Sequence, residues 1–259
     1  MAVILEGGCL VAQMREGELL VKDNLAIWQE IGRTRGAQAI SLRTLEFANG
    51  LSPGICNPDC DEIFYVLEAP ESDEPASFFI DGWPYGVRAE TGIYLQPGAT
   101  LAVNNPGPKP LVLISSQCPE PRTSSEFVPA VTSPAAQTRT PEHPPVVRLA
   151  DREIVPTGDR YFRVLVDSDV GSSQVTQFVG SIPPGRAPAH FHEYEEVLLI
   201  LHGTGRMWAG RTHAAIAVGS CVYLPKGQIH CVENIGSDEL RLLGVFYPAG
   251  SPSARQEVS

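Results

Sequence analysis

Three histidines and one glutamate in the second half of the chain have the types and the spacing of metal ligands. His190, His192 and Glu196 fall in one short stretch, and His230 ends the later segment Pro225–His230. Imidazole nitrogens and carboxylate oxygens bind divalent transition metals such as Fe, Mn, Ni, Cu or Zn, and the same ligands accept any of them. The set predicts one divalent metal of undetermined identity; the alternative is ordinary surface or core histidines without a metal.

The spacing of these residues also indicates the elements that must position them. In an extended strand, residues two apart point to the same face, so His190 and His192 point together and Phe191 points away. His230 comes from a distant hairpin that has to close the set. Gly185 and Gly227 lie where the chain has to turn on either side of the ligands.

The rest of the chain predicts many strands and few helices. The sequence has 24 glycines and 23 prolines in 259 residues, and 43% of its residues are hydrophobic. Short apolar or alternating runs lie between Gly, Pro and Asn residues, for example at 162–166, 175–179, 197–201 and 240–247. We expect short helices only near 25–31 and in the C-terminal tail. Antiparallel barrels or sandwiches follow from this pattern.

The two halves of the chain repeat one another. Residues 61–68 match 195–202, and residues 94–98 match 223–227. A loop around Glu71–Pro75 takes up a small difference in spacing. A stretch rich in Pro, Ser, Thr and Ala separates the halves and indicates a linker. A repeat of this length predicts a duplicated domain, with the boundaries 1–117, 118–145 (linker) and 146–259.

The second half resembles a cupin domain. Two motifs of that superfamily fit at full spacing, and they consist of Gly185, His190, His192, Glu196 and Gly203, then Gly219, Pro225, Gly227, His230 and Asn234. The resemblance implies an all-β protein of two tandem cupin barrels, that is, an RmlC-like bicupin with a double-stranded β-helix or jelly roll in each half. It also implies that His190, His192, Glu196 and His230 bind the metal inside the second barrel.

The first half resembles a cupin that has lost its metal site. Glu62, Gly98, Asn105 and Gly107 align with their counterparts, but Cys56, Pro58 and Leu101 stand where the second half has its histidines. Because proline and leucine side chains cannot bind a metal, we expect a structural barrel. The alternative is an unusual thiolate site made by Cys56, Asp59, Cys60 and Glu62.

Residues around the metal are predicted from strand position alone. Tyr161 and Arg163 lie two apart on one strand, where Arg163 could bind a substrate carboxylate and Tyr161 could donate a hydrogen bond. The alternative is a solvated strand face. An apolar pocket wall is expected from Phe178, Trp208, Tyr223 and Phe246, whose alternative role is ordinary core packing.

The resemblance implies a metal-dependent enzyme acting on a small organic molecule. The first choice is an oxidoreductase of the quercetinase-like dioxygenase class, in which Glu196 is also the catalytic base. A small-ligand sensor or storage cupin without turnover is one alternative, and a cupin isomerase or lyase is another.

Charge and hydropathy limit the partners. The net charge of −11 argues against nucleic acid and anionic membranes. The sequence has no apolar run long enough to span a bilayer and no secretory signal, which predicts a cytoplasmic protein. The expected partners are a small-molecule substrate or ligand and, as in many relatives, a second copy in a homodimer.

Overall fold

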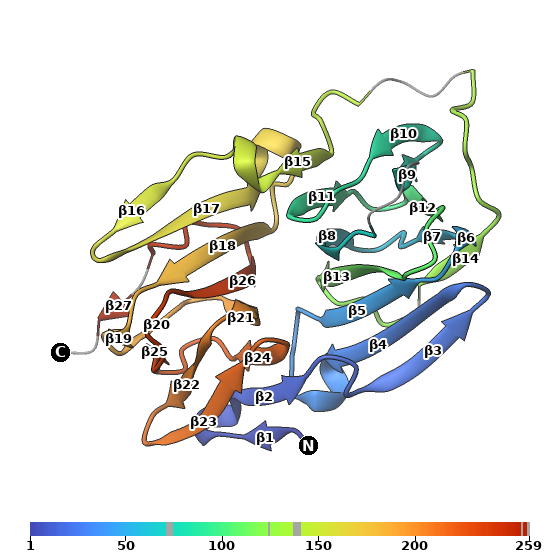
Figure 1. Cartoon of the computed structure of the whole chain (residues 1–259). Helices are drawn as coiled ribbons and strands as arrows, with labels where there is room; N and C mark the ends of the chain where they lie inside the picture. Colours follow the sequence, from blue (N-terminus) through green and yellow to red (C-terminus); the bar gives the residue numbers. More distant parts are fainter. Residues whose placement is uncertain (71–74, 124, 137–140, 255, 258–259) are drawn as a thin grey trace.

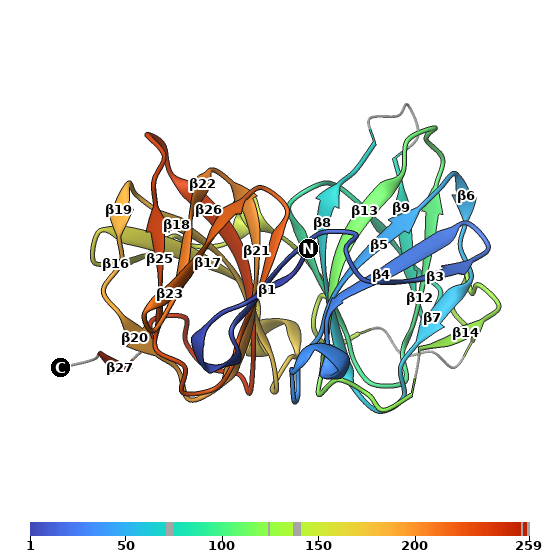
Figure 2. The ribbon, with the colours of Figure 1, turned by 90° about the horizontal axis from the view of Figure 1, so that it is seen from below.

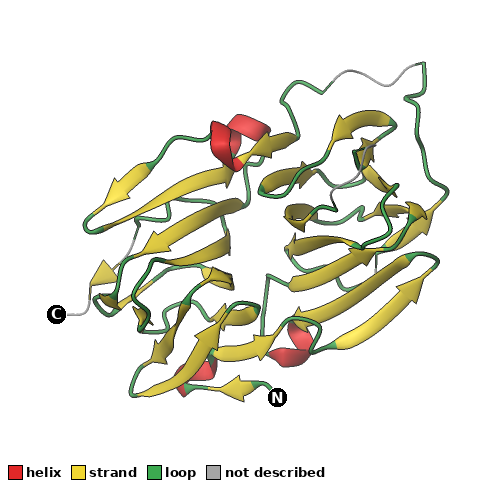
Figure 3. Cartoon of the chain, viewed as in Figure 1, coloured by secondary structure: helices red, strands yellow, loops and turns green. Residues whose placement is uncertain are grey.

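The chain folds almost entirely into antiparallel β-strands (Figures 1 and 3). The computed structural model describes residues 1–70, 75–123, 125–136, 141–254 and 256–257. Helical structure in this part of the chain is limited to the short 3-10 helices η1 (Glu6–Gly8), η2 (Arg33–Arg35), η3 (Leu149–Asp151) and η4 (Ser168–Val170). No helix among the described residues has the length and apolar character needed to cross a membrane. The all-β fold predicted from the sequence is confirmed.

Two sheets form the C-terminal barrel. The eight-stranded sheet has the order β1 (Val3–Ile4), β2 (Leu10–Gln13), β24 (Ser220–Leu224), β21 (Glu195–His202), β26 (Leu240–Tyr247), β18 (Thr176–Ile182), β17 (Arg160–Val166) and β16 (Val155–Thr157). The six-stranded sheet has the order β23 (Thr212–Ala217), β22 (Thr204–Ala209), β25 (His230–Asn234), β20 (His190–Phe191) and β27 (Gln256–Glu257), with β19 (Gly185–Arg186) also beside β25.

The N-terminal barrel repeats this plan. Its seven-stranded sheet has the order β15 (Val146–Arg148), β11 (Thr91–Leu95), β8 (Asp61–Glu68), β13 (Leu111–Cys118), β5 (Leu42–Phe47), β4 (Leu25–Ile31) and β3 (Glu18–Lys22). Its six-stranded sheet has the order β10 (Trp83–Gly86), β9 (Ser77–Ile80), β12 (Thr100–Asn105), β7 (Gly54–Cys56) and β14 (Glu126–Val128), with β6 (Gly50–Leu51) beside β12.

Three apolar clusters explain why these sequences form two packed barrels. One cluster fills each barrel, and a third lies between the barrels. Figure 2 shows the two barrels side by side. On β21, Leu198 and Ile200 face the inside of the C-terminal barrel, whereas Val197 and Leu199 face the N-terminal barrel. Both faces of the strand are buried, so its sequence is continuously apolar rather than alternating.

The duplication predicted from the sequence is visible strand by strand. β8 corresponds to β21, and β11 corresponds to β24. Each barrel has the same hydrogen bond between these two strands. The Tyr94 hydroxyl donates to Asp61, and the Tyr223 hydroxyl donates to Glu195, both at 2.5 Å. The loop expected to absorb the difference in length includes residues 71–74, which lie outside the described residues.

Each barrel takes a strand from the other side of the molecule. β2 pairs with β24 of the C-terminal barrel, and β15 pairs with β11 of the N-terminal barrel. β14, which lies in the predicted linker, pairs with β7. The domain boundaries at residues 117 and 145 stay a prediction. The sheets themselves combine strands from before and after the predicted linker.

The helix expected near residues 25–31 is wrong. Leu25–Ile31 is strand β4, which pairs with β3 on one side and β5 on the other. Leu25 and Ile27 are buried in the N-terminal core, so alternation along the strand, rather than a helical face, determines the structure here. Gln256 and Glu257 of the tail form β27, and residues 255 and 258–259 of the expected tail helix lie outside the described part of the chain.

Candidate metal centre

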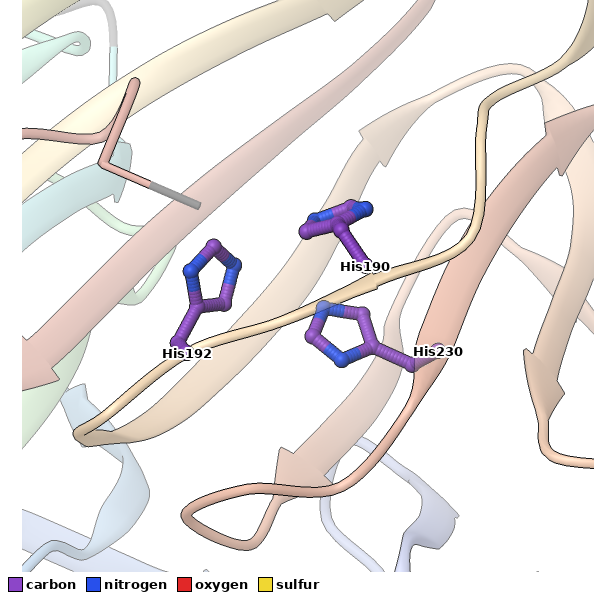
Figure 4. Close-up of side chains that lie close together, drawn as sticks. All are labelled: His190, His192 and His230. Atoms are coloured by element: carbon purple, nitrogen blue, oxygen red, sulfur yellow. The ribbon is translucent and has the colours of Figure 1, made fainter. Parts of the chain in front are cut away.

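Three histidine rings converge inside the C-terminal barrel. His190 on β20 pairs directly with His230, the first residue of β25, and His192 follows two residues after His190 (Figure 4). The ring centroids lie 4.9 Å apart for His190 and His192, 4.5 Å for His190 and His230, and 5.1 Å for His192 and His230. One ligand nitrogen from each ring lies within 4.8 Å of the other two. The triad is positioned for one divalent transition metal.

Backbone carbonyls orient all three rings. The Nδ1 atoms lie 3.0, 2.9 and 2.8 Å from the carbonyl oxygens of Pro188, Ala254 and Gln228, in the order His190, His192 and His230. A neutral imidazole that donates from Nδ1 carries its lone pair on Nε2, and such contacts fix the ring orientation at metal sites. Backbone therefore selects the tautomer that presents Nε2 as the ligand atom.

Glu196 reaches the same site from the opposite sheet. Its Oε2 lies 3.7 Å from Nε2 of His192, and both side chains are buried. Burial raises the pKa of Glu196 to about 8. Burial, followed by the neighbouring His190, lowers the pKa of His230 to about 3. A divalent cation at this point would favour both the ionised carboxylate and the neutral imidazoles, so the donor set fits a metal.

An aromatic stack supports His192 from behind. The Tyr194 ring lies parallel to His192 at 4.6 Å and to Phe246 at 4.2 Å, with interplanar angles of 9° and 16°. Burial, together with the charge of Glu196, raises the pKa of Tyr194. The stack fixes the plane of the His192 ring while the Ala254 carbonyl fixes its rotation.

A small cavity opens onto the triad and Glu196. Its volume is about 110 Å³. The wall is mainly apolar and includes Phe162, Phe178, Ile182, Ala187, Leu198, Val232 and Leu242. Pro252 and Ser253 close one side, next to the carbonyl that holds His192. Apart from the four candidate ligands, the one charged residue lining the cavity is Arg160, among the described residues.

The structure separates the six residues expected around the substrate. Tyr161 and Phe178 line the cavity, with the Tyr161 hydroxyl bonded to Glu239 Oε2 at 2.9 Å. Phe246 lies behind the wall, where its ring contacts Phe178 at 6.0 Å between centroids. The remaining three lie elsewhere.

Arg163, Trp208 and Tyr223 have other partners. Arg163 donates to the Leu149 carbonyl at 3.0 Å, on the face of β17 opposite Phe162. Trp208 lies outside the barrel, under the Arg186 guanidinium and stacked on His213. Tyr223 belongs to the cluster between the barrels.

Arg160 is the charged lining residue that the sequence reasoning missed. It lies on β17 two residues before Phe162, whose side chain is in the core of the C-terminal barrel. Strand alternation places Arg160 on the cavity side with Phe162 and puts Arg163 on the other face. Arg160 could have been predicted only if the inward face of β17 had been known.

The equivalent place in the N-terminal barrel holds an ion pair. Glu62, which aligns with Glu196, accepts hydrogen bonds from Arg43, Asn57 and Ser115. The Cys56 thiol donates to the Gly98 carbonyl at 3.4 Å, and burial raises the pKa of Cys60 to about 12. A high thiol pKa disfavours the thiolate that a soft metal site needs.

Comparison with known proteins identifies the superfamily. Residues 178–246, which span both motifs and most of the triad's surroundings, match the Cupin_2 family model, described as a cupin domain. This segment of the chain is a cupin domain. Auxin-binding protein 1 of Arabidopsis thaliana is 29% identical over 86 residues; this match covers 29% of the cupin chain and 43% of that relative's length.

Solved structures agree over both barrels. Oxalate decarboxylase from Bacillus subtilis at pH 4.6 superposes with a TM-score of 0.75 and 14% identity, over 96% of this cupin and 78% of that chain. A deletion variant of the same enzyme gives a TM-score of 0.75 and 13% identity, over 96% and 79% of the two chains. At this identity the likeness establishes the shared two-barrel fold.

Proposed function

We propose that this cupin is a metal-dependent enzyme that acts on a small organic molecule in the cavity of the C-terminal barrel. His190, His192, Glu196 and His230 are the proposed ligands. The observation that carries the proposal is the convergence of three histidines, each oriented through Nδ1 by a backbone carbonyl, in the lining of one cavity. Orientation of this kind is typical of metal-ligating histidines.

The residues around the cavity have complementary roles. A metal bound there would supply a Lewis acid that lowers the pKa of a substrate hydroxyl. The Glu196 carboxylate, which lies 3.7 Å from Nε2 of His192 and lines the same cavity, is the group placed to take up that proton. The apolar wall formed by residues such as Phe162, Phe178 and Leu198 excludes water from the reacting centre.

The cavity limits the substrate and favours an oxygenase. Its volume of about 110 Å³ is of the order of a cavity that holds one benzene-sized molecule, roughly 150 Å³. A volume of this order favours a single-ring phenol or a short enol over a three-ring flavonol. Apolar walls favour such substrates over a small dianion, because burying two charges requires several compensating partners. The proposed reaction is therefore dioxygenation of a small phenol or enol.

A second candidate is the decarboxylation of a small carboxylate. Arg160 lines the cavity and carries a permanent positive charge that can pair with a carboxylate. The Bacillus subtilis enzymes that share the two-barrel fold are oxalate decarboxylases. The two candidate reactions differ in the gas that they exchange, since dioxygenation consumes O₂ and decarboxylation releases CO₂.

Metal analysis and gas exchange test the proposal together. We expect one divalent metal per chain in the purified protein, and its loss in the His190→Ala and His230→Ala variants. The His213→Ala variant is the matched control, because this histidine is exposed and lies outside the cavity, on Trp208. Each protein is then incubated with catechols, diketones and small carboxylates while O₂ and CO₂ are followed.

The outcomes separate the candidates. O₂ consumption that disappears in His230→Ala and persists in His213→Ala supports the oxygenase, and CO₂ release without O₂ uptake supports the decarboxylase. A wild-type protein that binds no metal, or a His230→Ala variant with unchanged metal content, would overturn the assignment of the site.

A further inference from the structure

The N-terminal barrel contains a larger hollow than the C-terminal barrel. Its volume is about 570 Å³, which is within the range typical of small-molecule sites. The hollow lies at the mouth of the barrel, next to the Arg43–Glu62 pair. Glu62 is the counterpart of Glu196, so the hollow occupies the place that corresponds to the metal-site cavity.

Strand alternation shows that one wall of the hollow lies on the inward face of the barrel. Arg43 is two residues before Leu45 on β5, and Gln29 is two residues after Ile27 on β4. Leu45 and Ile27 belong to the core of the N-terminal barrel, so Arg43 and Gln29 share its inward face. The lining is therefore produced by the fold, rather than by a chance depression of the surface.

Arginines dominate the charge of this hollow. Four of them line it: Arg33, Arg35, Arg43 and Arg122. The two lining carboxylates are Glu18 and Glu120. A positive excess in a chain with a net charge of −11 is a local feature, and a concave wall concentrates its field on small anions.

Hydrogen bonds hold the guanidinium groups in place. Arg43 donates to Glu62 and Ser115 through one terminal nitrogen and to Ser125 through the other at 3.2 Å. Arg33 donates to the Glu120 carbonyl at 2.6 Å. These contacts engage only part of the five N–H donors that each arginine carries. No described residue accepts the Nε–H of the buried Arg43.

Part of the wall of the hollow is apolar. Leu20, Ile27 and Phe127 contribute to its wall. Guanidinium groups and apolar side chains in one lining match a molecule with a carboxylate at one end and carbon at the other. We propose that the hollow of the N-terminal barrel binds a small organic carboxylate. This site is separate from the metal centre and does not depend on the reaction proposed there.

Calorimetry with defined probes tests this proposal. Succinate and benzoate are titrated into the full chain at low salt, and succinamide is the neutral analogue of succinate. We expect binding of at least one carboxylate and none of succinamide. Arg122→Ala removes an exposed lining guanidinium and should weaken binding about tenfold, the loss of one charge-assisted contact. Arg88→Ala is the matched control, because Arg88 is equally exposed and lies outside the hollow.

The His230→Ala variant separates this site from the metal centre. Carboxylate binding that persists in His230→Ala and weakens in Arg122→Ala supports the proposal, whatever the outcome of the metal analysis. The proposal fails if neither carboxylate binds, if His230→Ala abolishes binding, or if Arg88→Ala weakens it as much as Arg122→Ala. It also fails if inorganic phosphate binds as tightly as the carboxylates, because the hollow would then act as a general anion trap.

Discussion

Glu195 connects the two barrels, and its removal should destabilise both. This buried carboxylate accepts hydrogen bonds from the backbone N–H groups of Gln38 at 3.0 Å and Ala39 at 2.7 Å, which belong to the N-terminal barrel. It also accepts the Tyr223 hydroxyl at 2.5 Å. The next residue is Glu196, so the same strand joins the interface to the metal centre.

The expected loss follows from the donors left without an acceptor. In Glu195→Ala, two backbone N–H groups and one hydroxyl lose their partner at once. Each such group costs roughly 1–3 kcal/mol when it is buried, and because the Gln38 side of the loop is exposed, we expect a total of about 4 kcal/mol. Tyr223→Phe removes a single hydrogen bond to a charged group, so its expected cost is about 1.5 kcal/mol.

Urea unfolding followed by tryptophan fluorescence measures both losses. Tyr94→Phe is the internal comparison, because Tyr94 makes the equivalent bond to Asp61 in the other barrel. It should cost about as much as Tyr223→Phe, roughly 1.5 kcal/mol. If Glu195→Ala costs no more than Tyr223→Phe, the backbone contacts to Gln38 and Ala39 contribute nothing, and the reasoning is refuted.

Two further substitutions probe burial and packing. Burial raises the pKa of Glu30 from 4.5 to about 7, so its contribution to stability is greatest below pH 4.5 and is lost as the pH rises through 7. Glu30→Gln removes this loss. In urea titrations, its free energy of unfolding relative to wild type should therefore rise by about 3 kcal/mol between pH 4.5 and 8. A difference that does not change with pH would contradict this. In Gly244→Ala, the new Cβ would lie 2.3 Å from Cε1 of Phe178, which must move into the cavity. Thermal unfolding should show a loss of stability of about 2 kcal/mol, and kcat/KM should fall. Gly86→Ala is the control, because a Cβ at this position meets open space. If Gly244→Ala has unchanged stability and activity, the cavity tolerates the shift of Phe178.

The convergence of the three histidines could be predicted because motifs encode it locally. His190 and His192 sit on one face of a strand by alternation, and the glycines and the proline around His230 indicate the turn that returns it. The duplication could also be predicted, because the segment that begins at Asp61 has the same order of acidic and apolar residues as the segment that begins at Glu195.

The orientation of β17 could not be predicted, and for a physical reason. One face of this strand packs inside the C-terminal barrel through Phe162, and the other packs against the N-terminal barrel through Leu165. Because both faces are buried, no alternation marks the inner face, and Arg163 was expected where Arg160 lies. Leu25–Ile31 illustrates the same limit, since a short apolar run fits a helix or a strand until its neighbours are known.

The exchange of β2 and β15 has a consequence for the integrity of the chain. A cut within residues 129–136 would give one fragment that carries β2 and another that carries β15, each needed by the other's sheet. Either fragment alone would expose an unpaired sheet edge, which favours aggregation. If the two fragments are produced together, they should assemble into a non-covalent complex. Each barrel then still has the strand that the other fragment supplies.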